Sequence, residues 1–286
     1  MDQETVATVY QNLDEKYFTD WEKESEKWET NGIYSEVLKM LELSESGIHV
    51  DLGIGTGIFL KNIYETQKKL KILGIEISHT IIQKCDELFQ NLGIPVKSLI
   101  LREYELIDGK IWLAPNKNIY PSINEGISLI CDDIRDLIVT KKILNEQKID
   151  SASLLFPGLG SAQAWQYPYE IKELTGTERI LILSEILGKI RISALEFMTK
   201  YMKPNGKAVI AERIAIQNLK EFFETMGNDK RILKYWNITL NVLENTSTHE
   251  KSSINWWDDG KKSDKNNVAV GIITLTRNQI EFNGGF

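Results

Sequence analysis

The feature that most constrains this chain is a glycine-rich segment that follows a short apolar run. The run reads as a buried strand that ends at Asp51. Three glycines then stand at every second position before a helix-like segment begins: Gly53, Gly55 and Gly57. Glycine at this spacing lets the backbone turn sharply and lets a ligand come close to the main chain. Because the N–H groups that open the next helix are free to bind such a ligand, the segment predicts a cradle for a nucleotide-type cofactor.

Short apolar runs alternate with helix-like stretches over much of the remaining chain. The runs that read as strands are 48–52, 72–77, 127–131, 151–156 and 208–211. This alternation predicts an α/β fold, Rossmann-like and doubly wound, with a mainly parallel sheet. Two β-branched runs near the C-terminus, 236–243 and 268–276, have no helix between them and predict an antiparallel strand pair.

The predicted domain organisation places a helical cover before the cofactor-binding domain. Residues 1–45 read as amphipathic helix and form the cover, and 46–286 form the domain. The cover carries an aromatic face that includes Tyr10, Tyr17 and Trp21. Core packing against the sheet explains such a face.

Two segments depart from the alternation of strands and helices. Residues 96–124 make the segment between the strands that end near Glu76 and Asp133 longer than a single connecting helix requires. Because they contain Asp108-Gly109 between two apolar-rich runs, they predict an inserted β-hairpin with a loop. Residues 244–267 form a long polar loop around Trp256-Trp257. Loops of this length are usually functional or disordered.

The composition narrows the class of protein. A formal net charge of -7 argues against non-specific binding to nucleic acid, which needs a basic surface. The two cysteines have no metal-ligand spacing, so we expect a reducing compartment and no metal site. The acidic N-terminus has no apolar signal segment, and no apolar run approaches the ~18 residues that span a bilayer. We expect a cytoplasmic protein without a membrane partner.

The spacing of the glycines discriminates between cofactors. Nicotinamide-binding folds use G-x-G-x-x-G, and here position 58 is isoleucine, while a P-loop needs a Gly-Lys-Ser/Thr that is absent. The stretch from Asp51 to Gly57 instead resembles the first motif of class I S-adenosylmethionine-dependent methyltransferases. Three further matches follow in the order of that family: Glu76 at the end of the second strand, Asp132-Asp133-Ile134, and the turn 202–210.

The aromatic N-terminal face resembles the helical cover that many small-molecule methyltransferases fold over the cofactor, where it would help to exclude water.

The resemblance implies an S-adenosylmethionine site and assigns roles to its residues. Glu76 would accept the ribose hydroxyls, and Asp133 with the Ile134 N–H would bind adenine. Asp132 stands where glycine is usual, so the choice between Asp132 and Asp133 stays open. The full set of expected cofactor-binding residues is Asp51, Gly53, Gly55, Thr56, Gly57, Glu76, Ile77, Asp132, Asp133, Ile134 and Phe156.

The acceptor side is less defined by the sequence. The fourth strand ends in Phe156-Pro157-Gly158, without the polar acceptor that amino-group and base methyltransferases of this superfamily often carry there, which disfavours DNA adenine or glutamine as acceptor. Aromatic residues are expected to form the acceptor wall: Tyr17, Trp21, Trp165, Tyr167 and Tyr169. No catalytic base stands out, and the candidates are His249, Tyr167 and Glu212.

The resulting hypothesis is in-line methyl transfer from S-adenosylmethionine to a small molecule or a protein side chain. Two alternatives stay open: aminopropyl or aminocarboxypropyl transfer on the same fold, and a non-catalytic methyltransferase-like subunit that supports a partner. The first is separated from methyl transfer by the mass added to the acceptor. The methyl acceptor atom is left undetermined, and a homodimer stays open.

Overall fold

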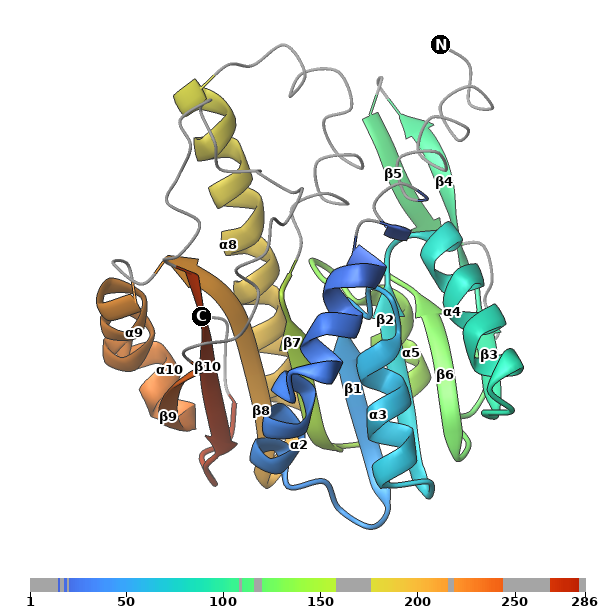
Figure 1. The fold of residues 1–286 in the computed structure, drawn as a ribbon, viewed down its shortest axis with the longest axis horizontal. Coiled ribbons are helices and arrows are strands. Elements are labelled where there is room, and N and C mark those ends of the chain that lie inside the picture. Colours follow the sequence, from blue (N-terminus) through green and yellow to red (C-terminus); the bar gives the residue numbers. More distant parts are fainter. Residues whose placement is uncertain are drawn as a thin grey trace.

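The computed structural model describes residues 15, 18–19, 21–107, 110–115, 120–157, 176–215, 219–243 and 268–282. The strands of its main sheet are β1 (Gly47–Leu52), β2 (Leu70–Glu76), β3 (Val96–Leu99), β6 (Gly126–Cys131), β7 (Ile149–Leu155), β8 (Met202–Ala215), β9 (Trp236–Leu243) and β10 (Val268–Arg277). Within the described ranges they form one eight-stranded sheet in the order β3-β6-β2-β1-β7-β8-β10-β9. The predicted α/β class with a mainly parallel sheet is confirmed (Figure 1).

The order of the strands reverses at β1. From β1 the chain moves outward to β2 and β6 on one side, and it later returns to place β7 and β8 on the other. All of these neighbours pair in parallel, and Asp51 is paired with Gly74 of β2 and with Ser153 of β7. In open α/β sheets a ligand binds at such a reversal, beyond the carboxyl ends of the strands.

The C-terminal strands confirm the predicted antiparallel pair. β10 is antiparallel to β9, with Ile273 paired with Leu240, and it is also antiparallel to β8. β10 therefore lies inside the sheet, and β9 occupies the edge. β10 is buried on both faces, and its β-branched run 268–276 supplies the apolar side chains for that position.

Helices cover both faces of the sheet. One face carries α2 (Ile33–Leu41), α3 (Ile58–Thr66) and α4 (His79–Asn91), and the other carries α5 (Ile138–Leu144), α8 (Gly176–Tyr201) and α10 (Lys230–Tyr235); α9 (Leu219–Asn228) contacts β9. Residues 21–30 are also helical, as expected for part of the cover. The molecule has three layers, with a helical layer on each side of the sheet (Figure 1).

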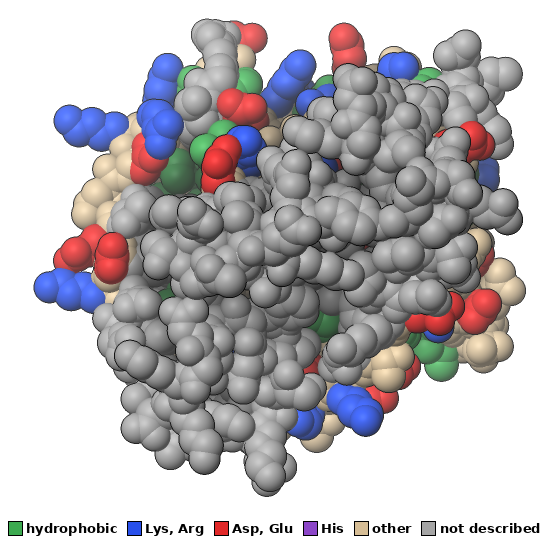
Figure 2. All heavy atoms as spheres, turned by 90° about the horizontal axis from the view of Figure 1, so that it is seen from above, with side chains coloured by type: hydrophobic (Ala, Val, Ile, Leu, Met, Phe, Trp, Pro, Cys, Tyr) green, Lys and Arg blue, Asp and Glu red, His purple; other side chains and the backbone are tan. Residues whose placement is uncertain are grey.

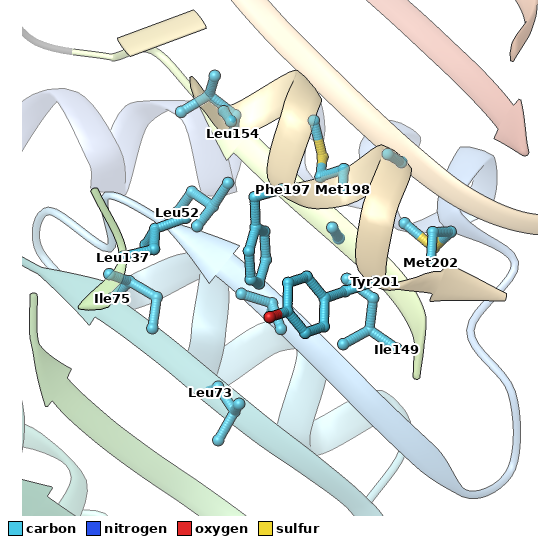
Figure 3. Packing of buried hydrophobic residues seen from close by; sticks show 14 of the residues in the cluster. Leu52, Leu73, Ile75, Leu137, Ile149, Leu154, Phe197, Met198, Tyr201 and Met202 are labelled. Carbon is cyan, nitrogen blue, oxygen red and sulfur yellow. The ribbon is translucent and has the colours of Figure 1, made fainter. Parts of the chain in front are cut away.

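Each layer of helices encloses its own core. Leu73 and Ile75 of β2 pack with the α8 residues Phe197 and Tyr201 on one face of the sheet (Figure 3). Ile72, which alternates with them, packs instead with α2, α3 and α4. Strands buried on both faces read as continuous apolar runs, which is why the parallel strands were recognisable in the sequence.

The inserted hairpin is present. β4 (Arg102–Ile107) and β5 (Lys110–Pro115) pair antiparallel in a separate two-stranded sheet, and the pairing of Ile107 with Lys110 leaves two residues for the turn. The hairpin projects past the carboxyl-end edge of the main sheet (Figure 1). One part of the segment differs from expectation: Val96–Leu99 forms β3, because the edge of β6 offers it a parallel partner.

Gly74 of β2 allows α3 to approach the sheet closely. A Cβ atom at this position would lie 2.6 Å from Leu60 Cδ1 and 2.8 Å from Ile54 Cγ2, both in the packed core. We expect Gly74→Ala to lower the free energy of unfolding by about 1–3 kcal/mol, the usual cost of overpacking. Urea denaturation would measure this change.

Gly188→Ala is the matched control for Gly74→Ala. Gly188 lies in α8, and a Cβ there would meet nothing within 4 Å. Alanine is the better helix former by about 1 kcal/mol, so this variant should be more stable than the parent. Equal effects from the two substitutions would show that close packing at Gly74 does not limit the residue at that position.

Candidate functional site

A pocket opens at the carboxyl ends of β1, β2, β6 and β7 and has a volume of about 970 Å³, part of which is open to solvent. It brings together most of the residues that the sequence predicted for the cofactor, together with one from the cover. The predicted residues in its lining are Trp21, Asp51, Gly53, Gly55, Thr56, Glu76, Ile77, Asp133, Ile134 and Phe156. Residues that the sequence had not assigned to the site also line it: Ser25, Trp28, Tyr34, Phe59, Arg135 and Ile190.

The three loop glycines have backbone angles that disfavour other residues. Their φ values are +79° at Gly53, +51° at Gly55 and +76° at Gly57. A Cβ on Gly55 would meet no atom within 4 Å, because it would point into the open space that a ligand can occupy. A Cβ on Gly57 would lie 3.0 Å from Cys85 Sγ and from Phe89 Cζ. Gly57 therefore permits α3 to pack on α4 and does not itself line the pocket.

Asp51 is 2% exposed and is held by a buried chain of polar groups between β1 and β7. Ser153 Oγ donates to Asp51 Oδ1, and the same oxygen lies 3.0 Å from His49 Nε2. His49 Nδ1 lies 2.8 Å from Ser151 Oγ. Because Ser153 gives its one proton to Asp51, His49 donates from Nε2 and accepts from Ser151 at Nδ1. This arrangement suits a neutral imidazole.

Burial shifts the pKa values of both ionisable groups in this chain. It raises the pKa of Asp51 to about 7, against the opposing hydrogen bond from Ser153, and it lowers the pKa of His49 to about 3. Both shifts disfavour the charged form, as desolvation does. Asp51 therefore changes charge near neutral pH at the point where β1 enters the glycine loop.

Glu76 is 6% exposed at the end of β2. Its Oε1 accepts hydrogen bonds from the N–H groups of Ile77, at 2.9 Å, and Ser78, at 3.2 Å. Ser78 Oγ in turn caps α4 by accepting from the N–H of Ile81. The turn at the end of β2 thus fixes the Glu76 carboxylate beside the pocket. His79 bonds through Nε2 to the carbonyl oxygen of Arg102 and does not line the pocket.

The two aspartates after β6 have different surroundings. Asp133 lines the pocket and forms a bidentate ion pair with Arg135, with Nε 2.9 Å from Oδ1 and Nη2 2.5 Å from Oδ2. Asp132 is fully buried away from the pocket lining, and its Oδ2 accepts from the N–H and the hydroxyl of Thr140. The choice that the sequence left open therefore favours Asp133 as the residue that faces a ligand.

Arg102 explains why aspartate stands at position 132. Arg102 is the first residue of β4 and is 3% exposed. Its Nη1 lies 2.6 Å from Asp132 Oδ1 and 2.6 Å from Asp136 Oδ1, and its Nε donates to the carbonyl of Leu113 at 2.8 Å. The base of the hairpin is thereby bound to the loop that carries Asp133.

An aromatic wall closes the β7 side of the pocket. The Trp28 ring lies 4.0 Å from Phe156 and 5.4 Å from Trp21, measured between centroids, and Tyr34 lies 6.3 Å from Trp28. Phe156 has a left-handed φ of +49°, which is uncommon outside glycine and typical of functional sites. The helical spacing of Trp21, Ser25 and Trp28 (i, i+4, i+7) is the sequence signal that places all three on one face.

Other predicted residues lie elsewhere. Glu212 is on β8, outside the lining, and its carboxylate is paired with Arg191, with Nε 2.6 Å from Oε1. The remaining acceptor-side and cover candidates lie outside the described residues: Tyr10, Tyr17, Trp165, Tyr167, Tyr169 and His249. In the portion of the chain that the structure describes, no group of three or more His, Cys, Asp or Glu could hold a metal ion.

The opposed pKa shifts of Asp51 and His49 predict a specific pH dependence of stability. From about pH 4 to 6.5 the native Asp51 keeps a proton that the unfolded chain has lost, so its contribution to stability falls as pH rises. Over the same range the unfolded chain protonates His49 and the native protein does not, so this contribution rises with pH. In Asp51→Asn only the His49 contribution should remain. The free energy of unfolding of the variant minus that of the parent should therefore rise with pH, by up to ~1.4 kcal/mol per pH unit. Denaturation curves that shift equally at every pH would contradict the assignment.

The Arg102 cluster predicts a large loss of stability when the arginine is removed. Arg102→Met leaves the buried Asp132 without its charged partner, which typically costs about 3–5 kcal/mol. Arg135→Met breaks an ion pair whose arginine is a quarter exposed and should cost less. Chemical denaturation of both variants tests the order, and a smaller loss for Arg102→Met would show that the hairpin is anchored by other contacts.

No protein-family model matches the sequence, and no curated protein matches it. Solved structures do share its fold. The [4+2]-cyclase SpnF is similar with a TM-score of 0.51 and 10% identity, over 87% of this chain and 80% of that chain. A chain from the complex between the Haloferax volcanii Trm112 methyltransferase activator and a candidate methyltransferase has a TM-score of 0.51 and 11% identity, over 94% of this chain and 99% of that chain.

Identities of this size make the likeness one of fold, and the two structures carry different activities in their names. The strand order, the antiparallel β10 between β8 and β9, and the glycine loop after β1 agree with that likeness. The chain has the Rossmann-like fold of the class I S-adenosylmethionine-dependent methyltransferases.

Proposed function

We propose that the protein is an S-adenosylmethionine-dependent methyltransferase. The observation that carries the proposal is the convergence of three carboxylates and an open glycine cradle in one pocket. Asp51, Glu76 and Asp133 come from the ends of three adjacent strands, and Gly55, which lines the same pocket, faces open space. These carboxylates are the hydrogen-bond acceptors expected for a ligand with an ammonium group, ribose hydroxyls and an adenine amino group.

The residues present fit the cofactor. Asp51 would pair with its α-ammonium group, Glu76 would accept the ribose hydroxyls, and Asp133 with the Ile134 N–H would bind the adenine edge. Ile77 and Ile134 provide apolar contacts to the ring. When bound, S-adenosylmethionine supplies a methyl group that its sulfonium makes electrophilic.

The protein's own contribution to the reaction is positioning and the exclusion of water. Trp28, Phe156 and Ile190 give the β7 side of the pocket an apolar surface. Alignment of a nucleophile with a methyl group can supply about 7–11 kcal/mol of the barrier reduction in favourable cases. A base is needed only when the acceptor enters protonated, and we assign none.

The acceptor that we propose is a small molecule or a protein side chain. Phe156 and Pro157, at the end of β7, offer no carboxylate or side-chain amide to a flat amino group. Among the described residues at the margin of the face in Figure 2, acidic and basic side chains are interspersed. The formal net charge of -7 does not favour a nucleic-acid surface. No helix in the described ranges is long and apolar enough to cross a membrane.

A second candidate function is that of a subunit that works with a protein partner. One observation favours it: a chain of similar fold occurs in a complex with a methyltransferase activator. Under this hypothesis the protein would bind the cofactor, and transfer would require the partner. Methyl transfer by the purified chain alone would contradict the hypothesis that a partner is required.

Substitutions in the cradle test the cofactor assignment. Gly55→Val fills the space in front of the loop and strains its left-handed backbone, and Glu76→Ala removes the ribose acceptor. We expect each to weaken the binding of S-adenosylhomocysteine, the demethylated product, by at least about tenfold, as loss of a hydrogen bond to a charged group does. Isothermal titration calorimetry measures the affinity.

Glu185→Ala is the control for these variants. Glu185 is an exposed carboxylate in α8 that pairs with Lys189, and its loss should leave the affinity unchanged. Parent-like affinity in both Gly55→Val and Glu76→Ala would refute the proposed site.

A further inference from the structure

Trp28 carries a buried hydrogen-bond donor that has no partner among the described residues. Its side chain is 2% exposed and lines the pocket, and its Nε1 makes no hydrogen bond with any described residue. Trp236, which is also buried, shows the usual arrangement, because its Nε1 donates to Thr199 Oγ1 at 2.8 Å. A buried N–H group without a partner is costly, so such a group at the wall of a pocket points to a ligand that accepts from it.

The ring of Trp28 is held in place on several sides. Phe156 lies 4.0 Å away, Trp21 lies 5.4 Å away and Tyr34 meets it edge-on at 6.3 Å, all between centroids. A ring packed in this way cannot turn its N–H to solvent without disrupting the wall. The donor is therefore fixed before any ligand arrives, which lowers the cost of ordering the site on binding.

The neighbours of Trp28 place it at the Asp51 end of the pocket. Tyr34 is 5% exposed and forms a hydrogen bond with Ser25. Burial raises the pKa of the Tyr34 hydroxyl, the bond with Ser25 opposes this rise, and the charge of nearby Asp51 adds to it. Trp28 also lies 4.0 Å from Phe156, which follows β7, the strand that pairs with β1 at Asp51. Glu76 and Asp133 lie at the ends of β2 and β6, on the other side of β1.

The chemistry of the lining identifies the ligand group that needs this donor. Among the described lining residues Arg135 carries the one positive charge, and it is bound to Asp133. An anionic group at the Asp51 end must therefore be held by neutral donors. In S-adenosylmethionine the anionic group is the α-carboxylate, which is bonded to the same carbon as the α-ammonium group assigned to Asp51.

We propose that Trp28 Nε1 donates a hydrogen bond to the α-carboxylate of S-adenosylmethionine. This inference rests on the proposed function and sharpens it. A site that recognises the carboxylate suits a methyl or aminocarboxypropyl donor and does not suit an aminopropyl donor, which lacks that group. It also explains the choice of tryptophan at this position, since phenylalanine has no N–H group to donate.

The test compares ligands that differ in the amino acid part of the cofactor. S-adenosylhomocysteine has both the ammonium and the carboxylate, S-adenosyl-3-thiopropylamine lacks only the carboxylate, and 5′-methylthioadenosine lacks both. Calorimetric titration of the full chain and of Trp28→Phe measures all three affinities. Trp28→Phe should weaken S-adenosylhomocysteine about 10- to 100-fold and leave the other two unchanged.

Trp236→Phe is the matched control, because it removes a satisfied indole N–H from the core on the other face of the sheet. It should leave all three affinities as in the parent. In thermal unfolding without ligand, Trp28→Phe should lose less stability than Trp236→Phe, since both variants lose buried ring volume but Trp28 Nε1 has no hydrogen-bond partner among the described residues. Trp236→Phe should be less stable, since Thr199 loses a hydrogen bond.

The outcomes separate this inference from the proposed function. If Trp28→Phe weakens all three ligands equally, or none of them, the carboxylate contact is refuted while the cofactor site stands. If the parent binds S-adenosyl-3-thiopropylamine more tightly than S-adenosylhomocysteine, the inference is also refuted, and aminopropyl transfer becomes the better hypothesis. If the parent binds none of the three, the proposed function falls and the inference falls with it.

Discussion

The contact between β1 and β7 is the constraint on which the rest of the site depends. The parallel sheet grows outward from these two strands in opposite directions, so the connections that leave their carboxyl ends diverge and leave a gap. Asp51 and Phe156 lie on the two sides of that gap. The two strands are joined by His49 of β1, whose ring bonds to Ser151 and Ser153 of β7. A neutral imidazole thus links the floor of the pocket across both strands, and any change in the spacing of the strands would disturb Asp51.

The sequence predicted those parts of the protein whose signals are local. The glycine loop needs left-handed φ values at every second position, so it is recognisable from three residues. The buried strands are recognisable because both of their faces are apolar, and the Asp108-Gly109 turn marked the hairpin. These features together determined the fold class and the cradle.

Features that depend on contacts between distant segments could not be predicted in the same way. Nothing local to Trp28 indicates that it meets Phe156, which lies more than a hundred positions later in the chain. The strand β3 depends on a free edge of β6 that is created later in the sequence. Aspartate at position 132 departs from the family pattern that the sequence resembles. The structure explains it by the ion pair with Arg102, a buried cation thirty positions earlier. Polar residues that serve another segment are the ones that sequence reasoning assigns least well.

The anchoring of the hairpin by Arg102 has a consequence for how this region can vary. The ion pairs to Asp132 and Asp136 and the bond to the Leu113 carbonyl all lie at the base of the hairpin, where β4 begins and β5 ends. None of these three bonds involves the turn. Insertions and deletions toward the tip would keep these bonds and so leave the loop of Asp133 in place. The length of the hairpin can therefore change without a change in the position of the pocket residue Asp133.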